Sequence, residues 1–190
     1  MPKWTSEPPT DREPYAYRIL RTPADKPLTG IITCTDIVGL NTHYVHNRTV
    51  PCEGIGACPW CDDGHSYRWH AYVSALIQPG LEHALFESTA AASETLRNYL
   101  AMYDTVRGCY FRGHRPSKRA NGRVVIECRP TDPAKTRLPD PPDVKRILCH
   151  IWSVQYTKAA DDLRTRYPAK DLHVTPSNGD GRNRPATHAK

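Results

Sequence analysis

Residues 66–77 carry the sequence SYRWHAYVSALI, which has pronounced strand character. Aromatic and β-branched side chains dominate it, and a strand places Tyr67 and Trp69 on one face and Arg68 and Tyr72 on the other. The face that carries Arg68 is the more polar of the two. A long strand with one polar face predicts a mainly β protein with an antiparallel sheet.

Other elements flank this strand on both sides. We expect strands at 28–38, 82–87, 105–113 and 123–129, and a helix from Ser88 or Thr89 to about Tyr103. The order of strand, insertion, strand, strand, helix, strand and strand matches the five-stranded Greek-key barrel called the OB-fold, in which a helix bridges the third and fourth strands. A small α+β domain with an antiparallel sheet is the alternative.

Proline marks the limits of the part that is expected to pack. The chain has 190 residues and 18 prolines, which concentrate near the N-terminus and after position 129. We expect a Pro-rich arm over 1–27, an OB-fold-like domain over 28–130, a linker and C-terminal helix over 131–156, and a basic disordered tail over 157–190. Apolar residues at helical spacing after Pro142 predict that the C-terminal helix covers 142–154.

The connection between the first two predicted strands, residues 39–64, contains three of the seven cysteines. Cys52, Cys58 and Cys61 lie in a glycine-rich stretch, and the Cys58-Pro-Trp-Cys61 turn can direct two sulfurs at one ion. Three thiolates and one imidazole form a tetrahedral zinc site. We therefore predict one structural Zn²⁺, with His43 as the fourth ligand. The alternatives for the fourth ligand are His46, His65 and Cys34.

The same thiols permit other interpretations. A Cys-x-x-Cys pair can be a redox dithiol, but such pairs are expected in a βαβ context, and here a glycine-rich loop and a strand flank the pair. Unligated thiols are a further interpretation. A catalytic zinc keeps an open coordination position and a nearby acid or base, a role that Glu53 could fill. Three cysteines and one histidine instead make a closed set, which favours the structural role.

The composition indicates the cellular compartment in which the protein is expected. No apolar stretch approaches the roughly 20 residues that span a bilayer, and the N-terminus lacks an apolar signal core. An odd number of cysteines, three of them in a metal-site pattern, fits a reducing compartment better than a disulfide framework. We expect a soluble cytoplasmic protein that has no membrane partner.

Positive charge gathers on the last two predicted strands and the hairpin between them. The formal net charge of the chain is +6, and Glu127 is the only acidic residue between positions 107 and 129. A basic hairpin suits a phosphate backbone, where ion pairing releases counterions, although a solvated surface loop would look the same. The residues expected to contact phosphates are Arg107, Arg112, Arg115, Lys118, Arg119 and Arg123.

Aromatic side chains accompany these cations. Unpaired bases stack on aromatic rings, which contributes about 1–3 kcal/mol per base and tolerates any base. On the long strand, Tyr72 and Arg68 share the more polar face and are the expected binding pair. Tyr110 and Phe111 point in opposite directions, so only one of them can be exposed for stacking. The pattern predicts binding of single-stranded nucleic acid with little sequence specificity.

The spacing of His43, Cys52, Cys58 and Cys61 inside an expected OB-fold resembles the zinc-bearing single-stranded-DNA-binding proteins of T-even-like bacteriophages. The resemblance implies a zinc subdomain that braces the barrel, a basic and aromatic-lined cleft for single-stranded DNA, and a role in DNA replication or recombination. It covers about a tenth of the chain as motif. Replication proteins of this kind usually end in an acidic tail, whereas residues 157–190 hold seven lysines and arginines against four aspartates.

Two other classes of function compete with nucleic-acid binding. A zinc-dependent nuclease would need histidines and asparagines around its metal, and the chain has these residue types near His43 without a recognisable framework. The glutamate of the zinc deaminase motif is absent beside both His43 and His46. An adaptor in a nucleic-acid-processing complex would bind a protein partner through Trp60 or through Trp152 on the 142–154 helix. We favour a non-enzymatic binding protein, with DNA ahead of RNA only because of the phage resemblance.

Overall fold

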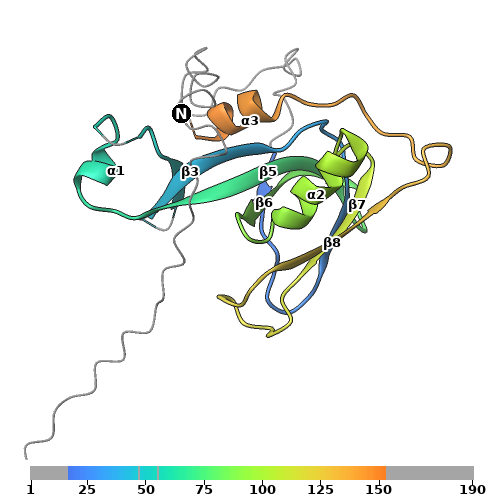
Figure 1. Ribbon diagram of the computed structural model, residues 1–190, viewed down its shortest axis with the longest axis horizontal. Coiled ribbons are helices and arrows are strands. Elements are labelled where there is room, and N and C mark those ends of the chain that lie inside the picture. The colour runs from blue at the N-terminus through green and yellow to red at the C-terminus, as the bar shows by residue number, and fades with distance from the viewer. Residues whose placement is uncertain (1–16, 47, 55, 153–190) are drawn as a thin grey trace, which may run out of the picture. The chain divides into compact units, whose positions relative to one another are not determined.

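Strands make up most of the regular structure in this computed structural model, which describes residues 17–46, 48–54 and 56–152 (Figure 1). The elements are β1 (Ile19–Leu20), β2 (Leu28–Ile32), β3 (Val38–Val45), β4 (Arg48–Pro51), α1 (Pro59–Asp62), β5 (Tyr67–Ile77), β6 (Glu82–Thr89), α2 (Glu94–Tyr103), β7 (Cys109–His114), β8 (Val125–Pro130) and α3 (Val144–Ile151). The prediction of a mainly β protein is confirmed.

The long strand β5 organises the sheet, as its sequence predicts. β6 pairs with it in antiparallel fashion along one edge, from His70 opposite Thr89 to Ile77 opposite Glu82. Two strands share the other edge: β3 pairs with its first half and β2 with its last residues. The strand expected over 28–38 is therefore two strands that part at a bend over 33–37, and the expected loop over 39–64 contains β3, β4 and α1.

The sheet is mixed and open, so the expected closed OB-fold barrel is not confirmed. Its strand order is β1-β6-β5-β2-β7-β8, with β3 and β4 branching from β5. β8 pairs only with β7 among the described residues, and β1 covers the outer edge of β6 by parallel pairing. A barrel would require the two terminal strands to meet. Here β1, which comes from the predicted N-terminal arm, occupies one of the edges that closure would need.

Helices cover the sheet and complete the core. α2 packs against β8 and buries Leu96 and Tyr99. It begins after Ser93, later than the sequence predicts, because β6 continues through Thr89. α3 packs against β5 and lies within the helix predicted over 142–154; residues 153 and 154, like residues 1–16 of the expected arm and the expected 157–190 tail, fall outside the described part. No described helix is long and apolar enough to cross a membrane.

A buried carboxylate ties the β3–β4 hairpin to the rest of the sheet. Glu87 on β6 is 5% exposed and accepts hydrogen bonds from Arg21 Nε at 2.7 Å, Arg21 Nη2 at 3.1 Å and the Tyr72 hydroxyl at 3.2 Å. The same guanidinium donates to Thr49 of β4. Arg21 therefore links two strands that do not pair with each other.

Replacing Glu87 with glutamine should destabilise the protein. The substitution keeps the shape of the side chain but removes the charge that its donors face, and hydrogen bonds to charged groups contribute about 1.5–3 kcal/mol each. Urea unfolding of Glu87→Gln measures this loss. Glu82→Gln is the matched control, because the Glu82–Arg18 pair is largely exposed and such pairs contribute about 0–1 kcal/mol. Equal losses in the two variants would contradict the assignment of a stabilising role to the buried carboxylate.

Candidate metal centre

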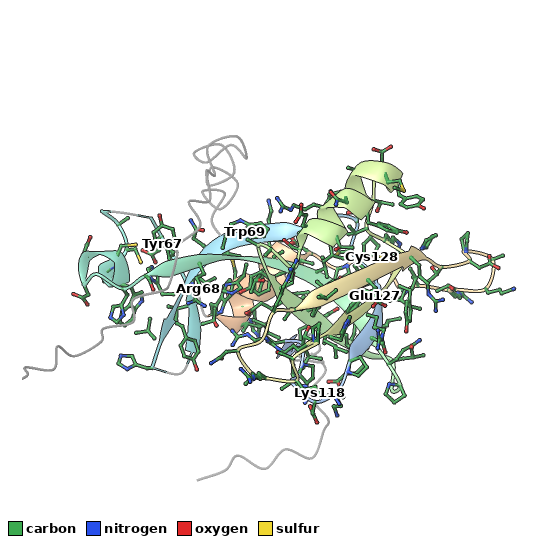
Figure 2. All side chains as sticks on the ribbon, turned by 60° about the horizontal axis from the view of Figure 1, so that its bottom comes forward. Tyr67, Arg68, Trp69, Lys118, Glu127 and Cys128 are labelled. Carbon is green, nitrogen blue, oxygen red and sulfur yellow. The ribbon has the colours of Figure 1, made fainter. Side chains whose placement is uncertain are left out.

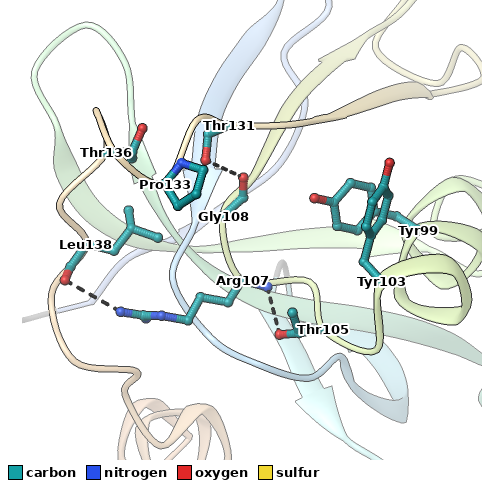
Figure 3. A pocket seen from close by; sticks show the side chains of 9 residues that line it. All are labelled: Tyr99, Tyr103, Thr105, Arg107, Gly108, Thr131, Pro133, Thr136 and Leu138. Carbon is teal, nitrogen blue, oxygen red and sulfur yellow. Dashed lines mark hydrogen bonds between the residues drawn. The ribbon is translucent and has the colours of Figure 1, made fainter.

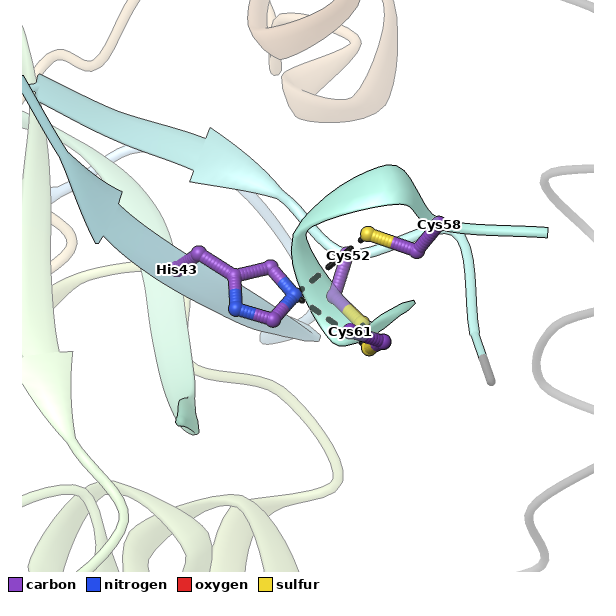
Figure 4. Close-up of side chains that lie close together, drawn as sticks. All are labelled: His43, Cys52, Cys58 and Cys61. Atoms are coloured by element: carbon purple, nitrogen blue, oxygen red, sulfur yellow. Dashed lines mark hydrogen bonds between the residues drawn. The ribbon is translucent and has the colours of Figure 1, made fainter. Parts of the chain in front are cut away.

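Four side chains from neighbouring segments converge beside the first residues of β5. His43 lies on β3, Cys52 follows β4, Cys58 precedes α1 and Cys61 lies within it. Their ligand atoms, one imidazole nitrogen and three sulfurs, all lie within 4.8 Å of one another. Figure 4 shows the His43 ring directed at Cys58 and Cys61. This group could hold one metal ion, and it consists of the four residues that the sequence predicts as ligands.

The β3–β4 hairpin brings the histidine and the first cysteine together. In its ladder His43 pairs with Val50, and the N–H of Cys52 donates to the carbonyl of Asn41 at 2.9 Å. Paired positions on neighbouring antiparallel strands lie close together. Because of this register, Cys52, the first residue after β4, lies close to His43.

The turn from Cys58 to Cys61, called the knuckle below, brings the other two sulfurs close to His43 and Cys52. Gly54 has a φ of 97°, a conformation that side chains with a Cβ rarely adopt, and the N–H of Cys58 donates to its carbonyl at 2.9 Å. Pro59 occupies the start of α1, and the N–H of Cys61 donates to the carbonyl of Cys58 at 3.0 Å. This tight turn directs both cysteines toward His43.

The distances fit a tetrahedral ion. With Zn–S bonds of about 2.3 Å and a Zn–N bond of about 2.0 Å, a tetrahedron separates two sulfurs by about 3.8 Å and a sulfur from the nitrogen by about 3.5 Å. The sulfurs of Cys52 and Cys61 are 3.4 Å apart. His43 Nε2 lies 3.4 Å from Cys58 Sγ and 3.5 Å from Cys61 Sγ. The group therefore needs only small adjustments to coordinate one ion.

The surroundings of His43 orient it as a ligand. Its side chain is 1% exposed, and Nδ1 lies 3.2 Å from the carbonyl oxygen of Ser66. A hydrogen donated from Nδ1 to this carbonyl selects the tautomer whose Nε2 lone pair faces the sulfurs. Metal-binding histidines in proteins commonly have such a partner.

The thiols are not equivalent in the absence of a cation. Burial, then hydrogen bonding and charge from Cys52 and Cys58, raises the pKa of the Cys61 thiol to about 12. Burial opposes ionisation of Cys58 as well, but hydrogen bonds from the backbone of Glu53, Cys61 and Trp60 lower its pKa below the ordinary value. Additional thiolates beside Cys58 are costly without a positive charge. A divalent cation supplies that charge and takes the place of the thiol protons.

The alternative fourth ligands lie outside the group. His46 and His65 each contact the Trp60 indole edge-on, with ring centroids 5.9 and 5.8 Å from it. The sulfur of Cys34 accepts a hydrogen bond from the backbone N–H of Ser74 at 3.3 Å.

Trp60, one of the residues expected to bind a protein partner, is half-buried, and His46 and His65 are its ring neighbours.

Tyr72 and Phe111 are inside the protein: the expectation that Tyr72 is accessible is wrong, and of the pair Tyr110 and Phe111, only one of which could be exposed, Tyr110 is the more exposed. Tyr72 is 0% exposed: α3 packs on β5, and the Trp152 ring meets the Tyr72 ring at right angles with 5.7 Å between centroids. Phe111 is also 0% exposed and stacks on Phe86 at 4.6 Å. Neither ring can stack on a base. Trp152 likewise contributes to packing.

Three of the predicted phosphate-binding arginines are occupied by partners within the protein. Arg107 donates to the carbonyls of Thr33 and Pro139, Arg115 donates to those of Thr22 and Gly122, and Arg112 forms an ion pair with Glu127 at 3.2 Å. Tyr110 is half-buried, with the guanidinium carbon of Arg129 4.4 Å from its ring centroid. These side chains brace the strands and loops around β7 and β8.

The remaining predicted cations are exposed in two places. Lys118, Arg119 and Arg123 lie in the segment between β7 and β8, and Arg68 lies on β5. Figure 2 shows Lys118 apart from Arg68. Within the described part of the chain, none of these four side chains has an ion-pair partner. The predicted cations thus form two separate exposed groups.

The sequence did not indicate a pocket of about 400 Å³ between α2 and the segment after β8 (Figure 3). Tyr99 and Tyr103 form one wall, with ring centroids 4.5 Å apart, and Arg107 and Leu138 lie across from them. Both tyrosines lie on α2, where Tyr99 is buried and Tyr103 is 45% exposed. The Arg107 guanidinium at this pocket is held by backbone carbonyls, which leaves its polar atoms largely satisfied.

Exposed Tyr44 on β3 is one of the aromatic residues that the sequence offers for stacking, but it was not selected as a site residue. It is 64% exposed, whereas the predicted aromatic residues Tyr72 and Phe111 are buried. Its sequence context of alternating polar residues resembles a loop, and only the pairing with β4 and β5 places it on a sheet.

Comparisons of the chain with protein-family models, with curated proteins and with solved structures found no match.

Proposed function

We propose that this protein is a non-enzymatic, zinc-stabilised binder of single-stranded nucleic acid that holds the phosphate backbone with the β7–β8 hairpin. One observation carries the proposal: Lys118, Arg119 and Arg123 are exposed and have no ion-pair partner among the described residues. The segment from Arg115 to Val124 contains no acidic residue. Unpaired cations on a hairpin are available to displace counterions from phosphates.

The choice of zinc rests on the donor set. Three sulfurs and one imidazole suit Zn²⁺, whereas Mg²⁺ and Ca²⁺ prefer oxygen ligands. A set of four protein ligands leaves no open coordination position, which supports a structural ion and argues against metal-assisted hydrolysis. Zinc would hold the β3–β4 hairpin and the knuckle in place.

Single strands are favoured over duplex by the exposed tyrosines. Tyr44 and Tyr67 are 64% and 48% exposed, and an unpaired base can stack on one of these exposed rings, whereas bases in a duplex are already stacked. The resemblance to the phage proteins supports DNA over RNA as the ligand. Fluorescence anisotropy with oligo-dT, oligo-rU and a duplex of equal length tests the order. Tightest binding to the duplex would contradict the proposal.

Removing the hairpin cations should weaken the salt dependence of binding. Each contacted phosphate of a single strand contributes a slope of about −0.7 to log K against log salt, so the triple variant Lys118→Gln/Arg119→Gln/Arg123→Gln should lose about 2 from the magnitude of the slope. Binding titrations of oligo-dT at several salt concentrations measure this change.

A control variant separates the hairpin from net charge. Arg97→Gln/Arg137→Gln/Arg146→Gln removes three exposed positive charges from other segments and should leave the slope nearly unchanged. Equal weakening in the two triple variants would mean that the whole surface, not the hairpin, attracts the strand. Cleavage of labelled oligonucleotides that disappears with Cys58→Ser would instead favour the nuclease.

A further inference from the structure

Exposed tyrosines concentrate beside the candidate metal centre. Among the described residues, the exposed tyrosines include Tyr44 and Tyr67, on β3 and β5, and Tyr103 at the end of α2. Tyr67 pairs with the metal-site residue His43, and the two rings meet edge-to-face at 6.1 Å. Tyr44 follows His43 directly and is the most exposed of the three. The β3–β4 hairpin therefore presents the Tyr44 ring to solvent.

Strand register places Tyr44 on the same face of the sheet as Arg68 and Thr49. Thr42 is paired with Arg68, so Tyr44, two residues further along β3, lies on the same face as Arg68 at a diagonal position. On its other side, Tyr44 is paired with Thr49, whose hydroxyl accepts a hydrogen bond from Arg21. Arg68 therefore lies on one neighbouring strand, β5, and Arg21 is hydrogen-bonded to the other, β4.

The two arginines differ in their availability. Arg21 donates to both carboxylate oxygens of Glu87, so a buried carboxylate offsets its charge. Arg68 is exposed and has no ion-pair partner among the described residues. Arg68 can therefore contact a phosphate while Tyr44 contacts the adjoining base, and Arg21 holds the strand on which Thr49 lies.

The hairpin that carries Tyr44 is fixed at several points. Thr42 Oγ1 lies 2.7 Å from His70 Nδ1, and Arg21 ties Thr49 to Glu87. The candidate metal ligands His43 and Cys52 stand at the two sides of the hairpin. A rigid aromatic surface loses little conformational entropy when a ligand binds. Metal binding would thus prepare the surface on which Tyr44 is presented.

We infer that Tyr44 is the position at which this protein stacks an unpaired base, with Arg68 at the neighbouring phosphate and the metal ion holding the hairpin that presents the ring. The inference rests on the proposed binding of single-stranded nucleic acid. It assigns base contacts to the β3–β4 hairpin and backbone contacts to the β7–β8 hairpin.

Oligonucleotides with and without bases separate the two kinds of contact. Oligo-dT and an abasic oligomer of the same length have the same phosphate charge, and stacking of one base should make the wild-type protein bind oligo-dT about 5- to 150-fold more tightly. Tyr44→Ala should bring this affinity ratio close to one, whereas Tyr44→Phe should keep it. Tyr103→Ala, which removes another exposed tyrosine, should leave the ratio unchanged.

The outcomes distinguish this inference from the proposed function. Steeply salt-dependent binding with equal affinities for the two oligomers would overturn the stacking position and leave backbone binding in place. Failure to bind either oligomer would overturn both. A ratio that survives Tyr44→Ala, or that falls equally in Tyr103→Ala, would also overturn the assignment to Tyr44.

A metal titration tests the remaining part of the inference. Protein stripped of metal by a chelator should have an affinity ratio close to one, and added Zn²⁺ should restore the wild-type ratio. The salt dependence of binding is the second measurement. Its slope should stay unchanged in metal-free protein, because the β7–β8 hairpin contains no metal ligand. A wild-type ratio in metal-free protein would overturn the role assigned to the ion.

Discussion

Replacing Cys58 with serine should release the metal ion and unfold the β3–β4 hairpin and the knuckle. Cys58 is 1% exposed, and its sulfur lies 3.4 Å from His43 Nε2, so serine removes one of four ligands from a buried site. In small zinc modules the metal contributes an apparent free energy of about 10–16 kcal/mol, which is comparable to the entire stability of many domains. The expected result is loss of bound zinc together with a lower melting temperature.

Zinc content per chain and thermal unfolding measure the two effects in the same preparation. Cys149→Ser is the matched control: Cys149 is half-buried on α3 and lies outside the group of four. It should retain one zinc ion per chain. Full zinc occupancy and an unchanged melting temperature in Cys58→Ser would refute the assignment of the metal centre.

Replacing Phe111 with alanine should affect stability and leave the affinity of the folded protein for oligo-dT unchanged. The ring is 0% exposed and stacks on Phe86 with 4.6 Å between centroids. Truncating a buried phenylalanine costs about 3–5 kcal/mol because it removes apolar burial and leaves a cavity. For a chain of this size, that corresponds to a fall in melting temperature of about 6–20 °C.

Urea unfolding and oligo-dT titration of the same variant separate the two properties. Tyr110→Ala is the control, because Tyr110 neighbours Phe111 in sequence but is half-buried on the opposite face of β7. Its loss of stability should be smaller. Normal stability with weakened binding in Phe111→Ala would mean that Phe111 contacts the ligand, as its sequence alone allows.

Local sequence was sufficient to predict the three cysteines of the candidate metal centre and to prefer His43 among four possible fourth ligands. The ligands fall within 19 residues of one another, from His43 to Cys61, and the glycines and Pro59 between them restrict the turn. The extent of β5 was also predicted correctly from its run of aromatic and β-branched residues, whereas the expected difference in exposure between its two faces was not, because residues 71–75 are all buried. Both features depend on neighbours in the chain.

Long-range pairing decided the architecture of the sheet. The segment 28–38 has strand-like residues, but the end of β2 at Ile32 and the extension of β3 to Val45 follow from pairing with different halves of β5. Parallel pairing of Ile19–Leu20 with β6 places part of the predicted Pro-rich arm at an edge of the sheet. Two residues carry too little periodicity to be recognised as a strand, and their partner lies more than 60 residues away.

Burial separates what the sequence settled from what only the tertiary structure decided. The chain's local pattern identified the cysteines, the basic hairpin and the alternation that puts Tyr72 opposite Trp69. It could not tell which face α3 would cover, and that helix, with Trp152 behind it, lies more than 70 residues after Tyr72. The tertiary contacts therefore buried Tyr72 and left Tyr44 exposed, because exposure depends on elements that are distant in sequence.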